Sequence, residues 1–244
     1  MAADKDVLIY EKKDYIATVM LNRPESRNAL NLAMCGALMK AANSISADPE
    51  IRLVLLRANG LAFCAGADLK EREGMTDARV RERRIAGFDA YAALESLPMP
   101  TIAVVEGPAI GSGCEIAGVC DFIVATPAAS FRTPEAIRGT VGATQRLPRI
   151  LGKRLAKDMM FTGRTLSAEE ARAAGLVSRL VAAADLERTL AEIETEILKA
   201  PAEALKLAKR CIDRGVELDP KGALETEIAA IEEQLAAGNW MGKR

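Results

Sequence analysis

The sequence predicts an α/β protein with a helical C-terminal part. Short apolar runs at residues 53–56, 101–105 and 122–125 have the length of buried strands, and helical patterns lie between them. From residue 142 onward, apolar side chains recur mainly at helical spacing. Alternating strands and helices followed by helices alone indicate an α/β core that ends in a helical region.

The first elements follow from local patterns. Residues 7–10 and 16–21 predict two strands joined by a charged turn at residues 11–14, so we expect the chain to open with a hairpin. Asn31 is expected to begin the first helix. A highly charged helix should then cover residues 77–97, because two prolines follow it closely.

The C-terminal half begins with a capping box. Ser167 and Glu170 should open a short helix that closes at Gly175, and residues 176–181 predict a short strand or an extended segment. Three amphipathic helices then end the chain, with apolar stripes at Leu186, Leu190, Ile193 and Ile197, at Leu205, Ala208 and Ile212, and at Leu224, Ile228, Ile231 and Leu235. These stripes lack an obvious partner within one subunit. We therefore expect residues 1–182 to form the core and residues 183–244 to pack between subunits.

Charge and composition exclude several classes of function. The 244 residues include 33 basic and 34 acidic side chains, so the net charge of -1 argues against nucleic acid or an anionic membrane as a partner. Five cysteines without CxxC spacing predict free thiols in a reducing compartment. The N-terminus resembles neither a signal peptide nor a transit peptide, and no apolar run has the ~20 residues of a membrane span. We expect a cytoplasmic protein.

Histidine is absent from the sequence. Its absence excludes a Ser-His-Asp or Cys-His apparatus and a His-ligated zinc, and we expect no metal site. Acid and base chemistry must therefore fall to Glu, Asp, Lys, Tyr or Cys. Cys64 is interpreted as an inert packed thiol, because no neighbouring His or cation activates it.

Two glutamates are the strongest candidates for acid and base chemistry. Glu115 follows the small-residue turn at residues 110–113, whose backbone N–H groups should begin a helix, and Glu135 follows Pro134. A second such turn at residues 63–69 follows the apolar strand at residues 53–56, at the strand end where α/β sheets bind ligands. Taken alone, either glutamate could instead be a first-turn acid that stabilises its helix. N–H donors beside two carboxylates would suit enolate chemistry.

Five motifs together resemble the enoyl-CoA hydratase/isomerase (crotonase) family. They are LNRP at 21–24 with NALN at 28–31, FCAGADL at 63–69, GSGCE at 111–115, PE at 134–135 and TQRL at 144–147 with TG at 162–163. The likeness runs from about residue 7 to about residue 235. It implies a spiral of repeated ββα units, assembled as a homotrimer or a dimer of trimers. It also implies an acyl-CoA thioester substrate and no cofactor beyond the coenzyme A of that substrate.

The resemblance implies a role for each matching residue. The thioester oxyanion hole falls on the backbone N–H groups of Ala67 and Ser112, and the two hydratase carboxylates fall on Glu115 and Glu135. The loops that contact coenzyme A correspond to Arg27, Ala29, Ala65, Asp68 and Leu69. Asp68 is expected to cap or fix its loop rather than to act in catalysis.

The chain departs from the family pattern at three places. Ser112 stands where the family usually has glycine, residues 139–146 form a shorter loop than usual, and the tail after Trp240 is short. Retention of both glutamates predicts an enoyl-CoA hydratase. The alternatives are another crotonase reaction, such as enoyl-CoA isomerisation or a specialised acyl-CoA dehydration, and a non-catalytic RNA-binding or scaffold protein.

An arginine-rich segment at residues 79–84 bears on the last alternative. It contains four arginines, but Glu82 lies among them. A concentrated basic helix for RNA would lack such an acid, so we interpret the segment as a solvated helix face, with coenzyme A phosphates as the alternative partner.

Overall fold

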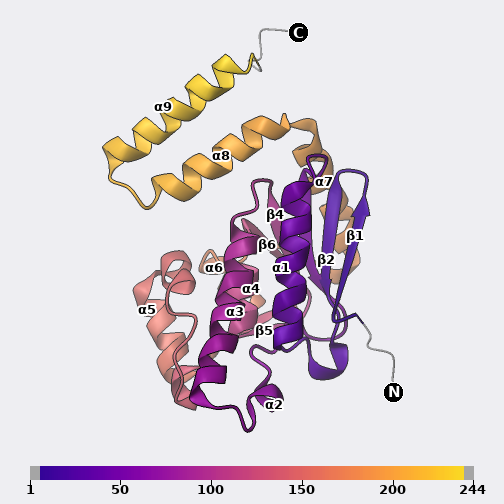
Figure 1. Cartoon of the computed structure of the whole chain (residues 1–244), viewed down its shortest axis with the longest axis vertical. Helices are drawn as coiled ribbons and strands as arrows, with labels where there is room; N and C mark the ends of the chain where they lie inside the picture. Colours follow the sequence, from indigo (N-terminus) through magenta and orange to yellow (C-terminus); the bar gives the residue numbers. More distant parts are fainter. Residues whose placement is uncertain (1–5, 239–244) are drawn as a thin grey trace.

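The computed structural model describes residues 6–238, and a sheet of six strands forms its centre (Figure 1). In spatial order the strands are β1 (Leu8–Lys13), β2 (Ile16–Leu21), β3 (Leu53–Ala58), β4 (Thr101–Val105), β6 (Phe122–Ala125) and β9 (Arg179–Leu180). β1 pairs with β2 antiparallel, and the other neighbours are parallel. The predicted α/β class is confirmed, and of the short strand or extended segment expected at residues 176–181 only Arg179–Leu180 form a strand.

The opening hairpin has a tighter turn than the sequence suggested. β1 continues through Lys13, which pairs with Ile16 of β2, so only Asp14 and Tyr15 form the turn. The prediction of a four-residue turn at residues 11–14 was therefore wrong. Asp14 has a φ of 51°, a conformation that Asp tolerates well, and this allows the two-residue turn.

A second, smaller sheet was missed in the sequence. It consists of β5 (Pro108–Ile110), β7 (Ser130–Arg132) and β8 (Thr165–Ser167), with β7 in the middle. Each strand has three residues, which is too short for an alternating pattern to stand out from a loop. β5 leads directly into α4 (Ser112–Gly118) and so positions the first of the two candidate glutamates.

Helices cover one face of the large sheet. α1 (Leu32–Ala47) and α3 (Asp77–Glu95) pack against each other in front of it (Figure 1). The side chain of Asn31 accepts a hydrogen bond of 2.9 Å from Met34 N, which confirms Asn31 as the cap of the first helix. The main core lies between this layer and the sheet.

The opposite face of the sheet is covered by α7 (Leu186–Lys199). Its residues Leu186, Leu190 and Ile193 pack with strand residues such as Leu53 and Ile102 in a second core. The expectation that all three C-terminal helices lack a partner within the subunit is therefore wrong for α7. A strand that is apolar on both faces, as β3 is, needs a helix on each side.

The connecting segments include three single-turn helices and α2. These are η1 (Pro24–Ser26), η2 (Ala136–Arg138), η3 (Ala183–Asp185) and α2 (Leu69–Arg72). α5 (Arg146–Thr162) follows η2, and α6 (Ala168–Ala173) begins with the predicted capping box, in which Ser167 N–H donates to Glu170 and Glu170 N–H to Ser167. The capping box is confirmed.

The last two helices extend away from the sheet. α8 (Ala202–Gly215) and α9 (Pro220–Ala236) lie side by side above the rest of the molecule (Figure 1). Their stripes leave large apolar side chains exposed, among them Ile212, Leu224, Ile228, Ile231 and Leu235. The tail from Trp240 lies outside the described residues. Among residues 6–238, no helix is both long and apolar enough to cross a lipid bilayer.

Candidate active site

The two small-residue turns predicted from the sequence lie against each other. Cys64 O accepts a hydrogen bond of 2.9 Å from Ile110 N, and Pro108 O accepts one of 3.2 Å from Cys64 N. At Gly66, which has a φ of +90°, a Cβ would stand 2.7 Å from Ile110 O and 3.7 Å from Ser112 N. Only glycine allows the backbone of one turn to approach the other so closely.

The N–H groups of Ala67 and Ser112 are free to bind a ligand. Leu30 forms two backbone hydrogen bonds on either side of Ala67: its N–H donates to Gly66 O, and its carbonyl accepts from Asp68 N, both at 2.8 Å. The N–H of Ala67 therefore points away from Leu30. Ser112 is the first residue of α4, where an N–H has no acceptor within the helix. In the part of the chain that the structure describes, neither group donates to another backbone carbonyl, and both residues line one cleft.

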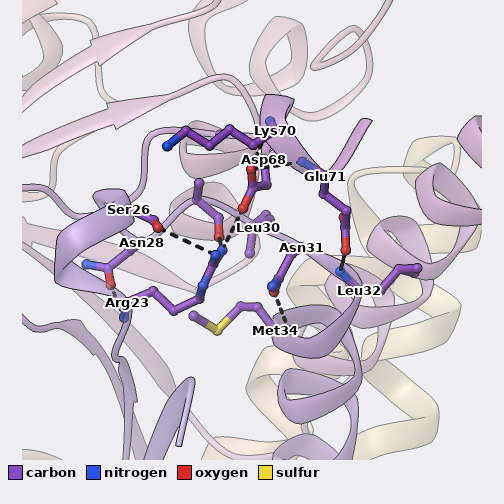
Figure 2. A network of polar contacts seen from close by, with 12 residues as sticks. Arg23, Ser26, Asn28, Leu30, Asn31, Leu32, Met34, Asp68, Lys70 and Glu71 are labelled. Atoms are coloured by element: carbon purple, nitrogen blue, oxygen red, sulfur yellow. Dashed lines mark hydrogen bonds and ion pairs between the residues drawn. The ribbon is translucent and has the colours of Figure 1, made fainter. Parts of the chain in front are cut away.

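Figure 2 shows the polar network that fixes the first turn. The Arg23 guanidinium lies between Ser26 and Asp68, with Nη1 2.9 Å from Asp68 Oδ2. The other oxygen of Asp68 accepts from the N–H groups of Lys70 and Glu71 at 3.1 and 3.3 Å. The carboxylate of Asp68 thus caps α2 and fixes its loop, as the sequence indicated.

Glu71 connects this turn to two helices. Its Oε1 accepts from Leu32 N at 2.9 Å, and its Oε2 accepts from Arg83 Nε at 2.7 Å. Arg83 is buried and also donates to Leu30 O. The interpretation of residues 79–84 as a solvated face is therefore wrong for Arg83. The helical periodicity of residues 79–84 could not reveal that Arg83 pairs with Glu71, twelve residues earlier in the sequence.

Glu115 lies on α4 and is almost completely buried, with 5% of its surface exposed. Burial raises the pKa of its carboxyl, whereas the Arg146 guanidinium, 3.9 Å from Oε1, opposes that shift. Arg146 is held by a two-pronged ion pair with Glu95, at 3.0 and 2.6 Å, and lies over the Tyr91 ring. Glu115 is thus a buried carboxyl beside a fixed cation.

Glu135 lies at the start of η2 and faces the same cleft. Burial raises its pKa, and its Oε2 is buried with no hydrogen-bond partner among the described residues. The charge of Glu135 also raises the pKa of Glu115. A buried carboxyl oxygen that lacks a partner is suited to the protonated form.

The remaining predicted residues divide into two groups. Ala65 and Leu69 line the cleft with the two glutamates. Ala29 is buried, and Arg27 has a φ of 51° and accepts a hydrogen bond of 2.9 Å from Ala65 N through its carbonyl, so its backbone supports the turn. Contact of Arg27, Ala29, Ala65, Asp68 and Leu69 with coenzyme A stays a prediction. Burial raises the pKa of the Cys64 thiol to about 12, which agrees with an inert cysteine.

Three residues of the cleft region were not found by sequence reasoning. Tyr91 is buried and is a polar neighbour of the Ser112 side chain, Arg146 lies beside Glu115, and Arg84 lies at the cleft wall. The TQRL motif contained Arg146 but gave no indication of its partner.

Comparison with known proteins decides the family. A model of the enoyl-CoA hydratase/isomerase family matches residues 11–238. The chain belongs to this family, also called the crotonase family. It is 38% identical in sequence to the short-chain-enoyl-CoA hydratase of Clostridium acetobutylicum, over 93% of this chain and 88% of that protein. The mouse mitochondrial enoyl-CoA hydratase domain-containing protein 2 is 40% identical, over 92% of this chain and 77% of that protein.

Solved structures of the crotonase family agree with the fold. The enoyl-CoA hydratase of Bacillus anthracis superposes with a TM-score of 0.89 at 35% identity, covering 93% of this chain and 90% of that one. The Mycobacterium smegmatis enoyl-CoA hydratase gives a TM-score of 0.91 at 33% identity, covering 98% and 92%. The predicted crotonase-like fold with a helical C-terminal part is confirmed.

Proposed function

We propose that this protein hydrates a trans-2-enoyl-CoA thioester. The observation that carries the proposal is the pairing of a buried carboxyl, Glu115, with a half-buried one, Glu135, in the cleft lined by the free N–H groups of Ala67 and Ser112. Coenzyme A enters as part of the substrate. No further cofactor has a role in this proposal.

The two N–H groups would form the oxyanion hole. Addition of water to the β carbon moves negative charge onto the thioester oxygen, and two aligned N–H donors stabilise that charge. In comparable sites, removal of one donor costs about 3 kcal/mol of transition-state stabilisation. Because Ser112 is the first residue of α4, the positive end of the helix dipole would also stabilise the negative charge on the thioester oxygen.

The environments of the two glutamates support different roles. Glu115 has a cation 3.9 Å away and would be the base that holds and deprotonates water. Glu135 has a buried oxygen without a partner and would deliver its proton to the α carbon. Water oxygen bonds to the β carbon as its proton passes to Glu115, the enolate collapses, and the α carbon takes the Glu135 proton. The proton on Glu115 must then return to Glu135 before the next cycle.

The assembly proposed with this function is a homotrimer or a dimer of trimers. The exposed apolar side chains of α8 and α9, such as Ile212 and Ile228, support contacts between subunits. A helix pair with this much apolar surface needs a cover, and further copies of the same chain are the simplest one.

The test is hydration of a panel of trans-2-enoyl-CoA thioesters, followed by loss of the absorbance of the conjugated thioester. Glu135→Gln should lower kcat by roughly 10² to 10⁴, because an amide cannot deliver the proton, and Glu115→Gln should act similarly. The control is Glu169→Gln, another first-turn acid but exposed and on α6, which should hydrate at the wild-type rate. Turnover by Glu135→Gln equal to the control would remove Glu135 from the reaction. Isomerisation of a 3-enoyl-CoA that survives one of the two changes would favour an isomerase.

A further inference from the structure

Arg84 connects α3 to the short loop that follows Glu135. Its Nη1 donates to Val141 O at 2.8 Å, and its Nη2 donates to Thr140 Oγ1 at 2.6 Å. Arg84, Thr140 and Val141 all line the cleft that contains the two glutamates. This connection joins segments that are 56 and 57 residues apart.

The loop that Arg84 holds contacts both glutamates. The backbone of Ala143 lies near the Glu115 carboxyl, and its N–H lowers the pKa of that group. Ala143 is 2% exposed and has a φ of 54°, an unfavourable conformation for alanine that its surroundings must maintain. On the other side of the loop, Gly142 lies so close to Glu135 that a Cβ would stand 3.1 Å from its Cγ. Movement of this loop would therefore disturb both carboxyls.

The charge of Arg84 acts on the same two carboxyls. Arg84 lowers the pKa of Glu115 and of Glu135, although burial is the larger influence on each. Within residues 6–238, Arg84 has no carboxylate at ion-pair distance. Arg146 and the Ala143 N–H also lower the pKa of Glu115, and Arg138 lowers that of Glu135. Glu115 in turn raises the pKa of Tyr91, and both glutamates raise that of Cys114.

We propose that Arg84 is a positioning residue, which clamps residues 140–143 and thereby holds the backbone of this loop against the carboxyls of Glu115 and Glu135. The proposal rests on the hydratase function proposed above. It assigns to Arg84 two separable effects, one of the forked hydrogen bond and one of the charge.

The fork requires arginine. A guanidinium presents several N–H groups in one plane and can reach a carbonyl and a hydroxyl at the same time, whereas the ammonium of lysine is a compact charge on a flexible stem. A lysine at position 84 would therefore retain the charge but weaken the clamp. Thr140→Val should also weaken the clamp. Valine has nearly the same shape as threonine and leaves the charge of Arg84 unchanged, but it lacks the hydroxyl that accepts the hydrogen bond from Arg84.

The experiment compares four variants by the pH dependence of kcat for enoyl-CoA hydration. Arg84→Gln should lower kcat roughly tenfold and move both limbs of the pH profile to higher pH, since loss of a nearby cation disfavours ionisation of both carboxyls. Arg84→Lys and Thr140→Val should lower kcat less and leave the profile in place. The matched control is Arg81→Gln, which removes the same charge from an exposed position of α3 and should change neither quantity.

Hydrogen exchange of the backbone amides at 139–145 tests the clamp without activity. These amides should exchange faster in Arg84→Gln than in wild-type protein or Arg81→Gln. If wild-type protein hydrates no enoyl-CoA, the proposed function fails but the exchange experiment still tests the clamp. Equal exchange in all three proteins, or an Arg84→Gln pH profile identical to that of Arg81→Gln, would overturn the proposal.

Discussion

Gly111 provides the space that the carboxylate of Glu135 occupies. A Cβ on Gly111 would overlap Glu135 Oε1, and the glycine has a φ of +54° immediately before the first residue of α4. The same residue therefore turns the chain into the helix that carries Glu115 and leaves room for the second glutamate. Its N–H donates to Arg132 O at 2.7 Å, which fixes the turn to β7.

Gly111→Ala should remove activity with a modest loss of stability. The methyl group would displace Glu135, so hydration should fall by roughly 10² to 10⁴, as expected for loss of an acid or base. With a φ of 54° and a ψ of -114°, this backbone is sparsely populated by residues with a Cβ and would cost alanine about 1–3 kcal/mol. Hydration kinetics and thermal unfolding of the variant measure the two effects.

Gly36→Ala is the matched control. Gly36 lies inside α1, and no heavy atom lies within 4 Å of the position its Cβ would take. Alanine there should raise stability by about 0.5–1 kcal/mol, because it favours the helix, and should leave hydration unchanged. Full activity in Gly111→Ala would show that Glu135 can move aside, and would contradict a fixed position for it.

The raised pKa values of the glutamates predict how stability depends on pH. Burial raises the pKa of both Glu115 and Glu135 in the folded protein. The folded state therefore binds these protons more tightly than the unfolded state, in which a glutamate has a pKa of about 4.3. Stability from these two groups is greatest below about pH 4.3 and falls as the pH rises through the folded-state pKa values.

Replacement of Glu135 by glutamine removes the contribution of Glu135 to this pH dependence. The Tm difference between Glu135→Gln and wild-type protein should shift in favour of the variant as the pH rises from 4 toward 8, and the double variant with Glu115→Gln should shift further. Thermal unfolding across this range is the measurement. A Tm difference that is the same at pH 4 and pH 8 would show that burial does not shift the carboxyl of Glu135.

Local signals in the sequence predicted many of the elements. Asn31 and the Ser167–Glu170 capping box gave correct helix starts, because a cap depends on residues within one turn. Strands of three residues, such as β5, gave no pattern of their own. They form because longer neighbouring elements bring them together, which a local reading does not detect.

The candidate site shows the same division. The motifs predicted the positions of Glu115 and Glu135, but the charges around them come from other segments. Arg146 is 31 residues from Glu115 in sequence, and Arg84 reaches Val141 across 57 residues. The run of arginines at residues 79–84 led us to expect a single solvent-exposed face of α3. Burial of Arg83 and the position of Arg84 at the cleft depend on tertiary packing.

Two changes at position 112 separate the backbone from the side chain. Ser112→Gly removes the hydroxyl but keeps the N–H, so hydration should stay within about tenfold of wild type and bulkier acyl groups should be accepted. Ser112→Pro deletes the N–H at the first helical position, where proline is best tolerated, and should lower hydration by roughly 10² to 10³. Rates across the enoyl-CoA panel give both results. A loss beyond tenfold in Ser112→Gly would assign the hydroxyl, which neighbours Tyr91, a direct role.

The exposed apolar face of α9 makes the last prediction. Leu224, Ile228, Ile231 and Leu235 recur at helical spacing and are all exposed in the single chain. Wild-type protein should be a trimer or hexamer by light scattering at micromolar concentration. The double change Ile228→Glu and Ile231→Glu should dissociate it, because charges would then have to be buried in the contact. Glu232→Gln, an exposed polar change on the same helix, should keep the wild-type mass. A wild-type monomer that still hydrates enoyl-CoA would overturn the assembly, and the apolar face of α9 would then serve another purpose.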